Sequence, residues 1–276
     1  MQFAPDYAII TSVELDHTDY FDSVEKLRES FVHSTEAATR VYISTDVDDY
    51  RALGDSMGKD IVYYGKGCSG GYEYSIESMD ISGARFTVRQ GDVEIGSFCL
   101  PIPGEYNVKN ATAAIALLSD LGMEACQINR ALSTFRGVPG RLEYIGDAHG
   151  RRVYLDYAHH PTAVRAALGL LHSLCERVTV VFRPHTYTRT RDLAKEFADA
   201  LGIADRVIIT DIYPAREAPI PGVKAEWLAS ITAGAEYIPL NLVAKRLLSD
   251  TDGIIVLMGA GDLSIVKEMI FKTNEE

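Results

Sequence analysis

The densest group of reactive side chains in this sequence lies between residues 183 and 192, which read Arg-Pro-His-Thr-Tyr-Thr-Arg-Thr-Arg-Asp. His185, Arg189 and Arg191 gather positive charge where a strand is expected to end and a helix to begin. A helix N-terminus favours anions, and the arginine fork matches carboxylates and phosphates. A solvated helix face is the alternative, but local positive charge is informative in a chain of formal net charge −12. We therefore expect an anion-binding site here.

A second group follows another expected strand, at residues 156–161, which read Asp-Tyr-Ala-His-His-Pro. Asp156 ends the strand and is placed to take ribose hydroxyls, and Pro161 fits the first position of the next helix. Two adjacent histidines, His159 and His160, are harder to explain by packing than one. One of them is still expected to be structural.

Three further segments carry weaker signals. Asn107 and Asn110 share one face of an expected first helical turn, and their amides suit an adenine edge as well as simple capping. Glu14 follows a strand end, where a carboxylate could hold magnesium, although a solvated acidic loop is the more common explanation. The glycines after Met258 begin like a dinucleotide fingerprint, but Ser264 replaces the third glycine, so we expect a tight turn.

The elements that position these residues fall into two α/β domains, expected at 1–138 and 139–276 on either side of a Gly-Val-Pro-Gly linker. In the first domain we expect a partial parallel sheet, an antiparallel meander between 72 and 100, and three helices. Its expected elements are strands at 7–11, 41–45 and 61–65, meander strands at 72–78, 84–89 and 93–100, and helices at 24–37, 105–121 and 124–135.

The second domain shows strict alternation of strands and helices, which predicts a Rossmann-like parallel sheet covered on both faces. Its strands are expected near 151–156, 177–183, 205–211 and 253–258. Its helices are expected near 161–173, 187–201, 222–232, 241–249 and 262–272.

Composition limits the class of protein. The chain has 276 residues, of which 47% are hydrophobic and 24% charged, as in ordinary globular proteins. Its acidity and the lack of a basic run argue against a nucleic-acid partner. No apolar stretch reaches membrane-spanning length, and no signal peptide is evident. The four cysteines form no C-x-x-C pair, so we expect reduced thiols in the cytoplasm.

Three segments in this order resemble the alanine-adding members of the Mur ligase family: 157–161, 184–191 and 213–222. The last two are long and unusual, and the resemblance extends over nearly the whole chain. It implies an ATP-dependent amide ligase of peptidoglycan synthesis. ATP phosphorylates the carboxylate of UDP-N-acetylmuramate, the amine of L-alanine attacks the acyl phosphate, and phosphate leaves.

The resemblance also implies roles for individual residues. Glu14 would bind magnesium with His17 close by, and Asn107 and Asn110 would face the adenine of ATP. The groups expected to approach the ribose and phosphates are Arg141 and Asp156. Those expected around alanine and the acyl phosphate are Tyr157 together with the catalytic candidates His159, His185 and Arg189. Arg189 could hold the alanine carboxylate.

Departures from the family pattern qualify these roles. The chain contains no G-x-x-x-x-G-K-[ST] phosphate loop, and the domain for the UDP moiety is missing. Tyr106 stands where the family usually has a histidine associated with a second metal. We therefore expect the chain alone to be inactive. It would be a fragment, a shortened protein, or one half of a split enzyme whose phosphate loop comes from another chain.

Three alternatives remain open. A related ligase of the same fold could add a preformed peptide instead of alanine. The chain could also be a non-catalytic binding or regulatory module, which the missing phosphate loop favours. A nicotinamide-dependent oxidoreductase is the least favoured reading, because its fingerprint is incomplete.

Overall fold

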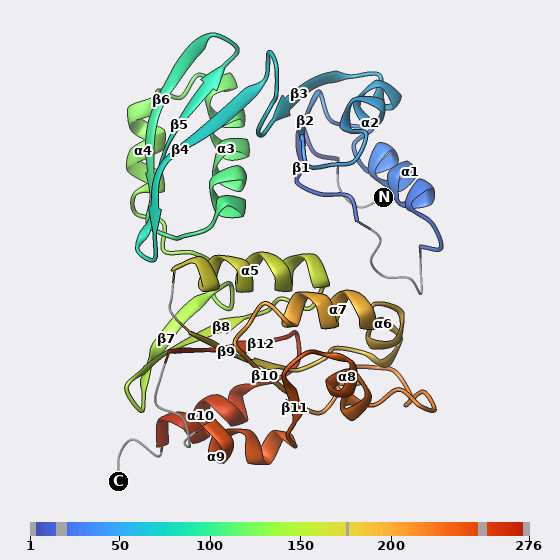
Figure 1. Ribbon diagram of the computed structural model, residues 1–276. Coiled ribbons are helices and arrows are strands. Elements are labelled where there is room, and N and C mark those ends of the chain that lie inside the picture. The colour runs from blue at the N-terminus through green and yellow to red at the C-terminus, as the bar shows by residue number, and fades with distance from the viewer. Residues whose placement is uncertain (1–3, 15–20, 175–176, 248–252, 273–276) are drawn as a thin grey trace. The chain divides into compact units, whose positions relative to one another are not determined.

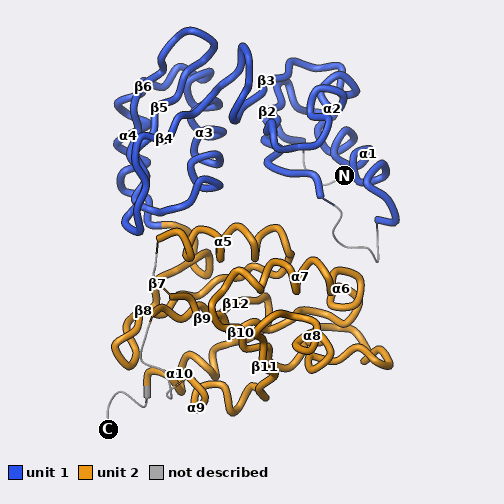
Figure 2. Tube along the Cα trace, in the orientation of Figure 1, with its two compact units in different colours: residues 1–136 blue, residues 137–276 orange. Residues whose placement is uncertain are grey.

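The computed structural model describes residues 4–14, 21–174, 177–247 and 253–272. The chain divides into two compact units, residues 1–136 and 137–276 (Figures 1 and 2). Within the described residues, no helix has both the length and the apolar character needed to cross a bilayer.

The first unit joins a parallel half-sheet to an antiparallel meander. Its strands are hydrogen-bonded in chain order, from β1 to β6. Pairing is parallel from β1 to β4 and antiparallel from β4 to β6. Its elements are β1 (Tyr7–Ile10), α1 (Val24–Ser34), β2 (Arg40–Ser44), α2 (Tyr50–Met57), β3 (Asp60–Tyr64), β4 (Tyr72–Asp80), β5 (Gly83–Gln90), β6 (Val93–Leu100), α3 (Glu105–Asp120) and α4 (Ala125–Leu132).

Local chemistry sets the helix starts in this unit. The Ser23 hydroxyl caps α1 by accepting a hydrogen bond from the amide of Lys26 at 3.3 Å. A capping box formed by Glu124 and Gln127 opens α4. Helix α3 begins directly after Gly104, whose φ of 110° is a conformation that other residues rarely adopt.

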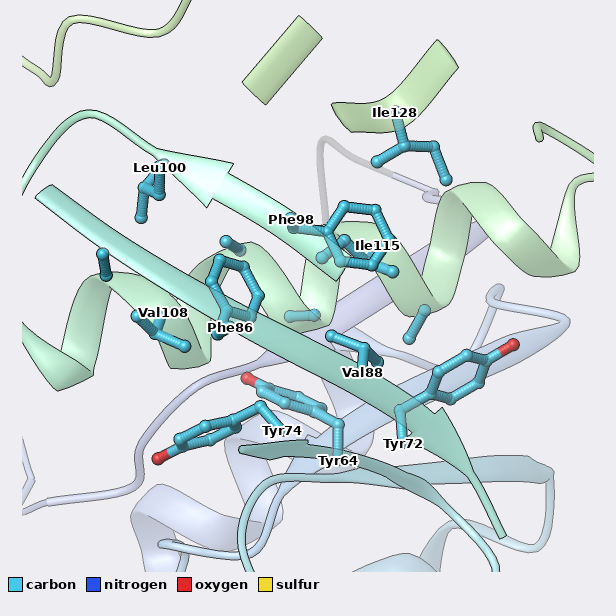
Figure 3. Close-up of a cluster of buried hydrophobic side chains, with 14 of the residues drawn as sticks. Tyr64, Tyr72, Tyr74, Phe86, Val88, Phe98, Leu100, Val108, Ile115 and Ile128 are labelled. Carbon is cyan, nitrogen blue, oxygen red and sulfur yellow. The ribbon is translucent and has the colours of Figure 1, made fainter. Parts of the chain in front are cut away.

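The core of the meander is aromatic and aliphatic (Figure 3). Phe86 of β5 and Phe98 of β6 are fully buried, and their ring centroids lie 5.8 Å apart. Ile115 of α3 and Ile128 of α4 belong to the same buried cluster. The two helices therefore cover one face of the meander, which fixes where α3 and its asparagines lie.

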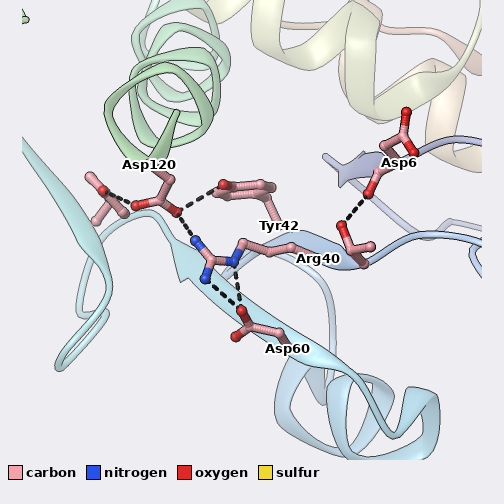
Figure 4. Close-up of polar contacts among 7 residues, drawn as sticks. Asp6, Arg40, Tyr42, Asp60 and Asp120 are labelled. Atoms are coloured by element: carbon pink, nitrogen blue, oxygen red, sulfur yellow. Dashed lines mark hydrogen bonds and ion pairs between the residues drawn. The ribbon is translucent and has the colours of Figure 1, made fainter. Parts of the chain in front are cut away.

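A polar network fastens the end of α3 to the sheet (Figure 4). The Asp120 carboxylate accepts hydrogen bonds from the hydroxyls of Tyr42 at 2.8 Å and Tyr72 at 2.7 Å. It also accepts one from Arg40 at 2.9 Å, and Arg40 in turn donates to Asp60 at 2.7 Å. Burial, then the bond to Asp120, raises the pKa of Tyr42 to about 12.

The second unit is a Rossmann-like sheet with the strand order β11, β10, β9, β12, β8, β7. Its elements are β7 (Glu143–Ala148), β8 (Arg151–Asp156), α5 (Pro161–Leu174), β9 (Val178–Phe182), α6 (Tyr187–Asp192), α7 (Ala194–Leu201), β10 (Arg206–Ile209), α8 (Ala225–Ile231), β11 (Ala235–Tyr237), η1 (Leu240–Leu242), α9 (Val243–Leu247), β12 (Ile254–Met258) and α10 (Ser264–Lys272). Every residue of β9 and β12 is buried, as expected for central strands covered on both faces.

The α/β class with a meander and a Rossmann-like second half is confirmed, but the expectation of a strictly parallel second sheet was wrong. Strand β7 pairs antiparallel with β8, and its register shifts between Tyr144 and Gly146. The expected helix at 187–201 is two helices, because Leu193 adopts φ −116° and leaves the helical region. The short strand β11 and helix α2 were also missed.

Candidate functional site

The candidate site lies at the carboxyl edge of the second sheet, where the chain order of the strands reverses. Strand β12 lies between β8 and β9 and pairs parallel with both. Helices α5 and α7, which follow β8 and β9, pack together, whereas α10 packs with α9. Such a switch point opens the crevice in which parallel sheets bind ligands. The loops at 157–160, 183–186 and 259–263 meet there.

Backbone hydrogen bonds hold these loops beyond the strand ends. The Gly259 amide donates to the carbonyl of Asp156 at 3.0 Å, and the Arg183 amide donates to the carbonyl of Met258 at 2.9 Å. The loops after β8 and β9 are thus fixed on either side of the β12 loop. The sequence places reactive side chains on both of these outer loops.

His185 and Arg189 form a direct pair. The Nη1 atom of Arg189 lies 3.0 Å from Nδ1 of His185. A guanidinium can only donate, so Nδ1 of His185 accepts and its ring proton is on Nε2. This pair requires a neutral His185 imidazole beside a permanent cation, an arrangement that offers an anion both charge and an N–H donor.

The proton of the His159 ring lies on the opposite nitrogen from that of His185. Its Nδ1 lies 2.9 Å from the carbonyl oxygen of Tyr157, which can only accept, so Nδ1 carries a proton. The ring centroids of His159 and His185 lie 5.8 Å apart. When both rings are neutral, Nε2 of His159 is an acceptor nitrogen and Nε2 of His185 carries a proton. The two neighbouring rings therefore have opposite hydrogen-bonding character at Nε2.

Aromatic rings and two guanidinium groups extend this pair. Tyr157 contacts His159 edge-on, with centroids 5.2 Å apart, and Tyr213 stacks on His185 at 5.7 Å. Arg141 lies over Tyr157 at 5.1 Å, and Arg183 lies over Tyr213 at 5.0 Å. Burial lowers the pKa of Arg183, although the nearby Asp262 carboxylate opposes that shift. The result is a cationic, aromatic-lined surface on one domain.

Asp156 lies beneath this surface. It is 6% exposed, and its two oxygens accept hydrogen bonds from the amides of Ala158 at 2.7 Å and Leu142 at 3.0 Å. Burial raises the pKa of its carboxyl against these bonds. Leu142 has a φ of 45°, so Asp156 holds a strained loop beside Arg141. Contact with ribose hydroxyls remains a prediction.

The sequence analysis expects the start of α6 to bind a ligand anion, but a carboxylate of the chain itself lies there. The carboxylate of Glu217 accepts hydrogen bonds from the amides of Tyr187 at 2.6 Å and Thr188 at 2.9 Å, and from the Thr188 hydroxyl. The first turn of α6 therefore binds an anion that the chain itself supplies. Arg191, grouped with the site by sequence, instead pairs with Asp192 at 2.6 Å on the exposed side.

In the first unit, Asn107 and Asn110 lie near the start of α3, as the sequence predicts. The side-chain amide of Asn107 donates to the carbonyl of Pro103 at 2.6 Å, so one of its donors serves the helix start. Asn110 is exposed. The geometry brings the two onto one helical face and leaves their contact with adenine a prediction.

Glu14 lies exposed in the loop after β1, and His17 lies outside the described residues. The part of the chain that the structure describes has no cluster of three or more His, Cys, Asp or Glu side chains able to hold a metal ion. One exposed carboxylate still fits magnesium, which commonly takes one or two carboxylates and completes its shell with water and phosphate oxygens.

Comparison with known proteins identifies both units. Residues 1–118 match the model of the Mur ligase middle domain, and residues 140–261 match that of the Mur ligase, glutamate ligase domain. The chain belongs to the Mur ligase family. Similar curated proteins include the UDP-N-acetylmuramate–L-alanine ligases of Renibacterium salmoninarum, 35% identical over 96% of this chain, and of Caldicellulosiruptor bescii, 34% identical over 99%.

The fold of this Mur ligase chain agrees with solved structures. The UDP-N-acetylmuramate–alanine ligase of Thermotoga maritima is 26% identical, with a TM-score of 0.79 over 99% of this chain and 60% of its own. A pseudomurein peptide ligase of Methanothermus fervidus, 21% identical with a TM-score of 0.74, shares the fold. The chain spans 59% and 62% of the two curated relatives.

Sequence reasoning missed three side chains of this candidate site. Arg183 was quoted without a role, and Tyr213 and Glu217 entered only through the family resemblance. A signal was available for Tyr213 and Glu217, because they follow β10, the strand next to β9 in the sheet. Parallel neighbours end at the same edge, so a polar loop after β10 lies near the loop after β9.

Proposed function

We propose that this chain is the ATP- and amino-acid-binding part of an ATP-dependent ligase that joins L-alanine to UDP-N-acetylmuramate. Its curated relatives named as UDP-N-acetylmuramate–L-alanine ligases align over nearly all of it. The observation that carries the proposal is the His185–Arg189 pair, with its 3.0 Å contact, at the switch point of the second sheet. An amino-acid ligase needs a cation for the substrate carboxylate beside groups that handle a developing anion.

Arg189 is the group that we assign to the alanine carboxylate. A guanidinium carries five N–H donors in a planar fork whose geometry matches a carboxylate. The ring of His185 would donate from Nε2 to an acyl-phosphate oxygen. His159 and Tyr157 line the same surface and would orient the amine. Positioning of this kind supplies much of the rate in reactions that combine several substrates.

ATP is assigned to the first unit. Asn107 and Asn110 would face the adenine, and Arg141 and Asp156 of the second unit would serve the ribose and phosphates. Glu14 would be a magnesium ligand, with His17 nearby. Magnesium would neutralise phosphate charge when bound. The γ-phosphoryl group would pass from ATP to the muramate carboxylate and leave ADP. The alanine amine would then displace phosphate from the acyl carbon and lose one proton to solvent.

The chain spans about three-fifths of the length of its curated relatives. Turnover is therefore assigned to the complete enzyme, and this chain is tested by ligand binding. Ligation by the complete enzyme, assayed with ATP, UDP-N-acetylmuramate and either L-alanine or a tripeptide, separates an alanine ligase from a peptide-adding relative.

Binding to the chain itself tests the site. L-alanine is titrated into the chain while the histidine ring resonances are monitored by NMR, and the resonances of His159 and His185 should shift. Arg189→Ala should abolish the response. Arg191→Ala is the matched control, because this neighbouring arginine pairs with Asp192 on the exposed side and should leave the response intact. Equal responses in wild type and Arg189→Ala would reject the assignment.

A further inference from the structure

The segment from Asp211 to Gly222 has no regular secondary structure, yet it is tied to the start of α6. Its residues 214–216, 218 and 219 are exposed, whereas Glu217 between them is half-buried. The Glu217 carboxylate accepts three hydrogen bonds from Tyr187 and Thr188. Burial acts to raise the pKa of this carboxyl, but the bonds outweigh burial and the pKa lies below its ordinary value. The group is therefore a bound carboxylate.

Tyr213, four residues before Glu217, is also hydrogen-bonded to the residues that precede α6. The amide of Tyr213 donates to the carbonyl of Pro184 at 2.8 Å, and the amide of Thr186 donates to the carbonyl of Tyr213 at 2.8 Å. These bonds form a parallel bridge between His185 and Tyr213, whose rings also stack. The segment thus contacts the chain on both sides of Thr186.

Thr186 is a strained residue that lies between the contacts made by Tyr213 and those made by Glu217. Its φ of 65° is a conformation that a β-branched residue rarely adopts. Such a backbone persists only where surrounding contacts determine it. The turn at Thr186 separates His185 from α6, and it lets Arg189, one helical turn later, reach back to the His185 ring at 3.0 Å. Geometry at this single residue therefore decides whether the pair forms.

We propose that Glu217 is a positioning residue that holds the His185–Arg189 pair in place through Thr186. Its carboxylate also occupies the amides at the start of α6, so a substrate anion is held by the side chains of His185 and Arg189 and not by these backbone groups. The link from this pair to alanine rests on the proposed function. The link from Glu217 to the pair does not.

Two variants of Glu217 separate geometry from charge. Glu217→Ala removes all three acceptor contacts. Glu217→Gln keeps a carbonyl for the two amides, and its NH₂ can donate to the Thr188 hydroxyl, which both donates and accepts. Glu236→Ala is the matched control, because the Glu236 carboxylate of β11 is also partly buried and binds Arg206 of β10 at 2.6 Å, not the start of α6. A merely structural carboxylate would behave like Glu236.

The test is the nitrogen chemical shift of the His185 ring in the ligand-free 276-residue chain, with each variant's unfolding midpoint measured in parallel. In wild type, Nδ1 should show the signature of an acceptor nitrogen. Glu217→Ala should shift it towards a mixture of tautomers, Glu217→Gln should retain most of the wild-type signal, and Glu236→Ala should lower stability without moving it. If Glu217→Ala does not fold, Thr188→Val, which removes one contact, should shift His185 in the same direction.

Binding of L-alanine to the same proteins separates the two claims. Affinity should fall about tenfold in Glu217→Ala, the order expected when a binding group is displaced by part of an ångström. An unchanged His185 signal in a folded Glu217→Ala chain, or in Thr188→Val where the alanine variant does not fold, overturns the positioning role. If His185 shifts as expected but wild type does not bind alanine, Glu217 keeps its role and the proposed function of the site fails.

Discussion

Replacing Asp120 with asparagine should destabilise the first unit strongly. The Asp120 side chain is only 13% exposed, and it is the shared acceptor for Arg40, Tyr42 and Tyr72. Asparagine can keep its oxygen at the position that binds Arg40 and Tyr42, and its NH₂ group then faces the Tyr72 hydroxyl. The variant therefore loses the negative charge at all three contacts, which connect the end of α3 with β2 and β4.

The size of the effect follows from these contacts. Hydrogen bonds to charged groups contribute roughly 1.5–3 kcal/mol each and neutral ones roughly 0.5–1.5 kcal/mol, so loss of the charge costs roughly 1–1.5 kcal/mol at each of the three contacts before solvent screening. Arg40 is 34% exposed, which weakens its part. We expect a loss of about 3 kcal/mol in the free energy of unfolding.

Urea unfolding can separate this effect from the second unit. Far-UV circular dichroism reports both units, whereas fluorescence of Trp227, the single tryptophan of the chain, reports α8 in the second. Asp120→Asn should lower the circular dichroism transition. Asp60→Asn is the control, because Asp60 binds the same arginine at 55% exposure and should cost less than about 1 kcal/mol. Equal losses in the two variants would refute the reasoning.

Two further predictions concern a close contact and acid stability. An added Cβ at Gly261 would lie 2.8 Å from Cδ of Arg183, so Gly261→Ala should weaken L-alanine binding in an NMR titration. Gly169→Ala is the control, because an added Cβ there meets no atom within 4 Å and should leave binding unchanged. Equal binding by the two variants would contradict the role of the Gly261 contact. The hydrogen bond from Lys66 is the largest cause that lowers the pKa of Glu105, and burial opposes it. This carboxylate therefore stabilises the fold above about pH 4.5, and the stabilisation is lost as the pH falls through the lower pKa of the folded state. Stability of wild type and Glu105→Gln should therefore converge in acid, and a constant difference from pH 7 to pH 3 would contradict the sign.

Much of the fold could be read from local patterns. The apolar run Ile254–Met258 is a strand because only a fully covered central strand tolerates such continuity. His185 and Arg189 could be paired from sequence because they lie four residues apart around a strand end. These features depend on neighbours in the chain, which is why periodicity and spacing reveal them.

The rest depends on contacts between distant residues. Strand β7 was missed because its irregular pairing with β8, at Gly146, breaks the alternation that marks a strand. Helix α2 was missed because Asp49 opens it in a left-handed conformation without a side-chain cap, so no start signal is present. The position of β12 between β8 and β9 follows from strand order, which local sequence does not encode.

The most direct test of the central claim is the kinetic response of the complete ligase to Arg189→Ala. If Arg189 binds the carboxylate of L-alanine, kcat/KM for alanine should fall by at least about 30-fold, since removing one partner of a bound charge pair costs on the order of 2–5 kcal/mol. The KM for ATP should change little, because none of the groups assigned to ATP is Arg189. Unchanged kcat and KM for alanine would contradict the assignment of this site.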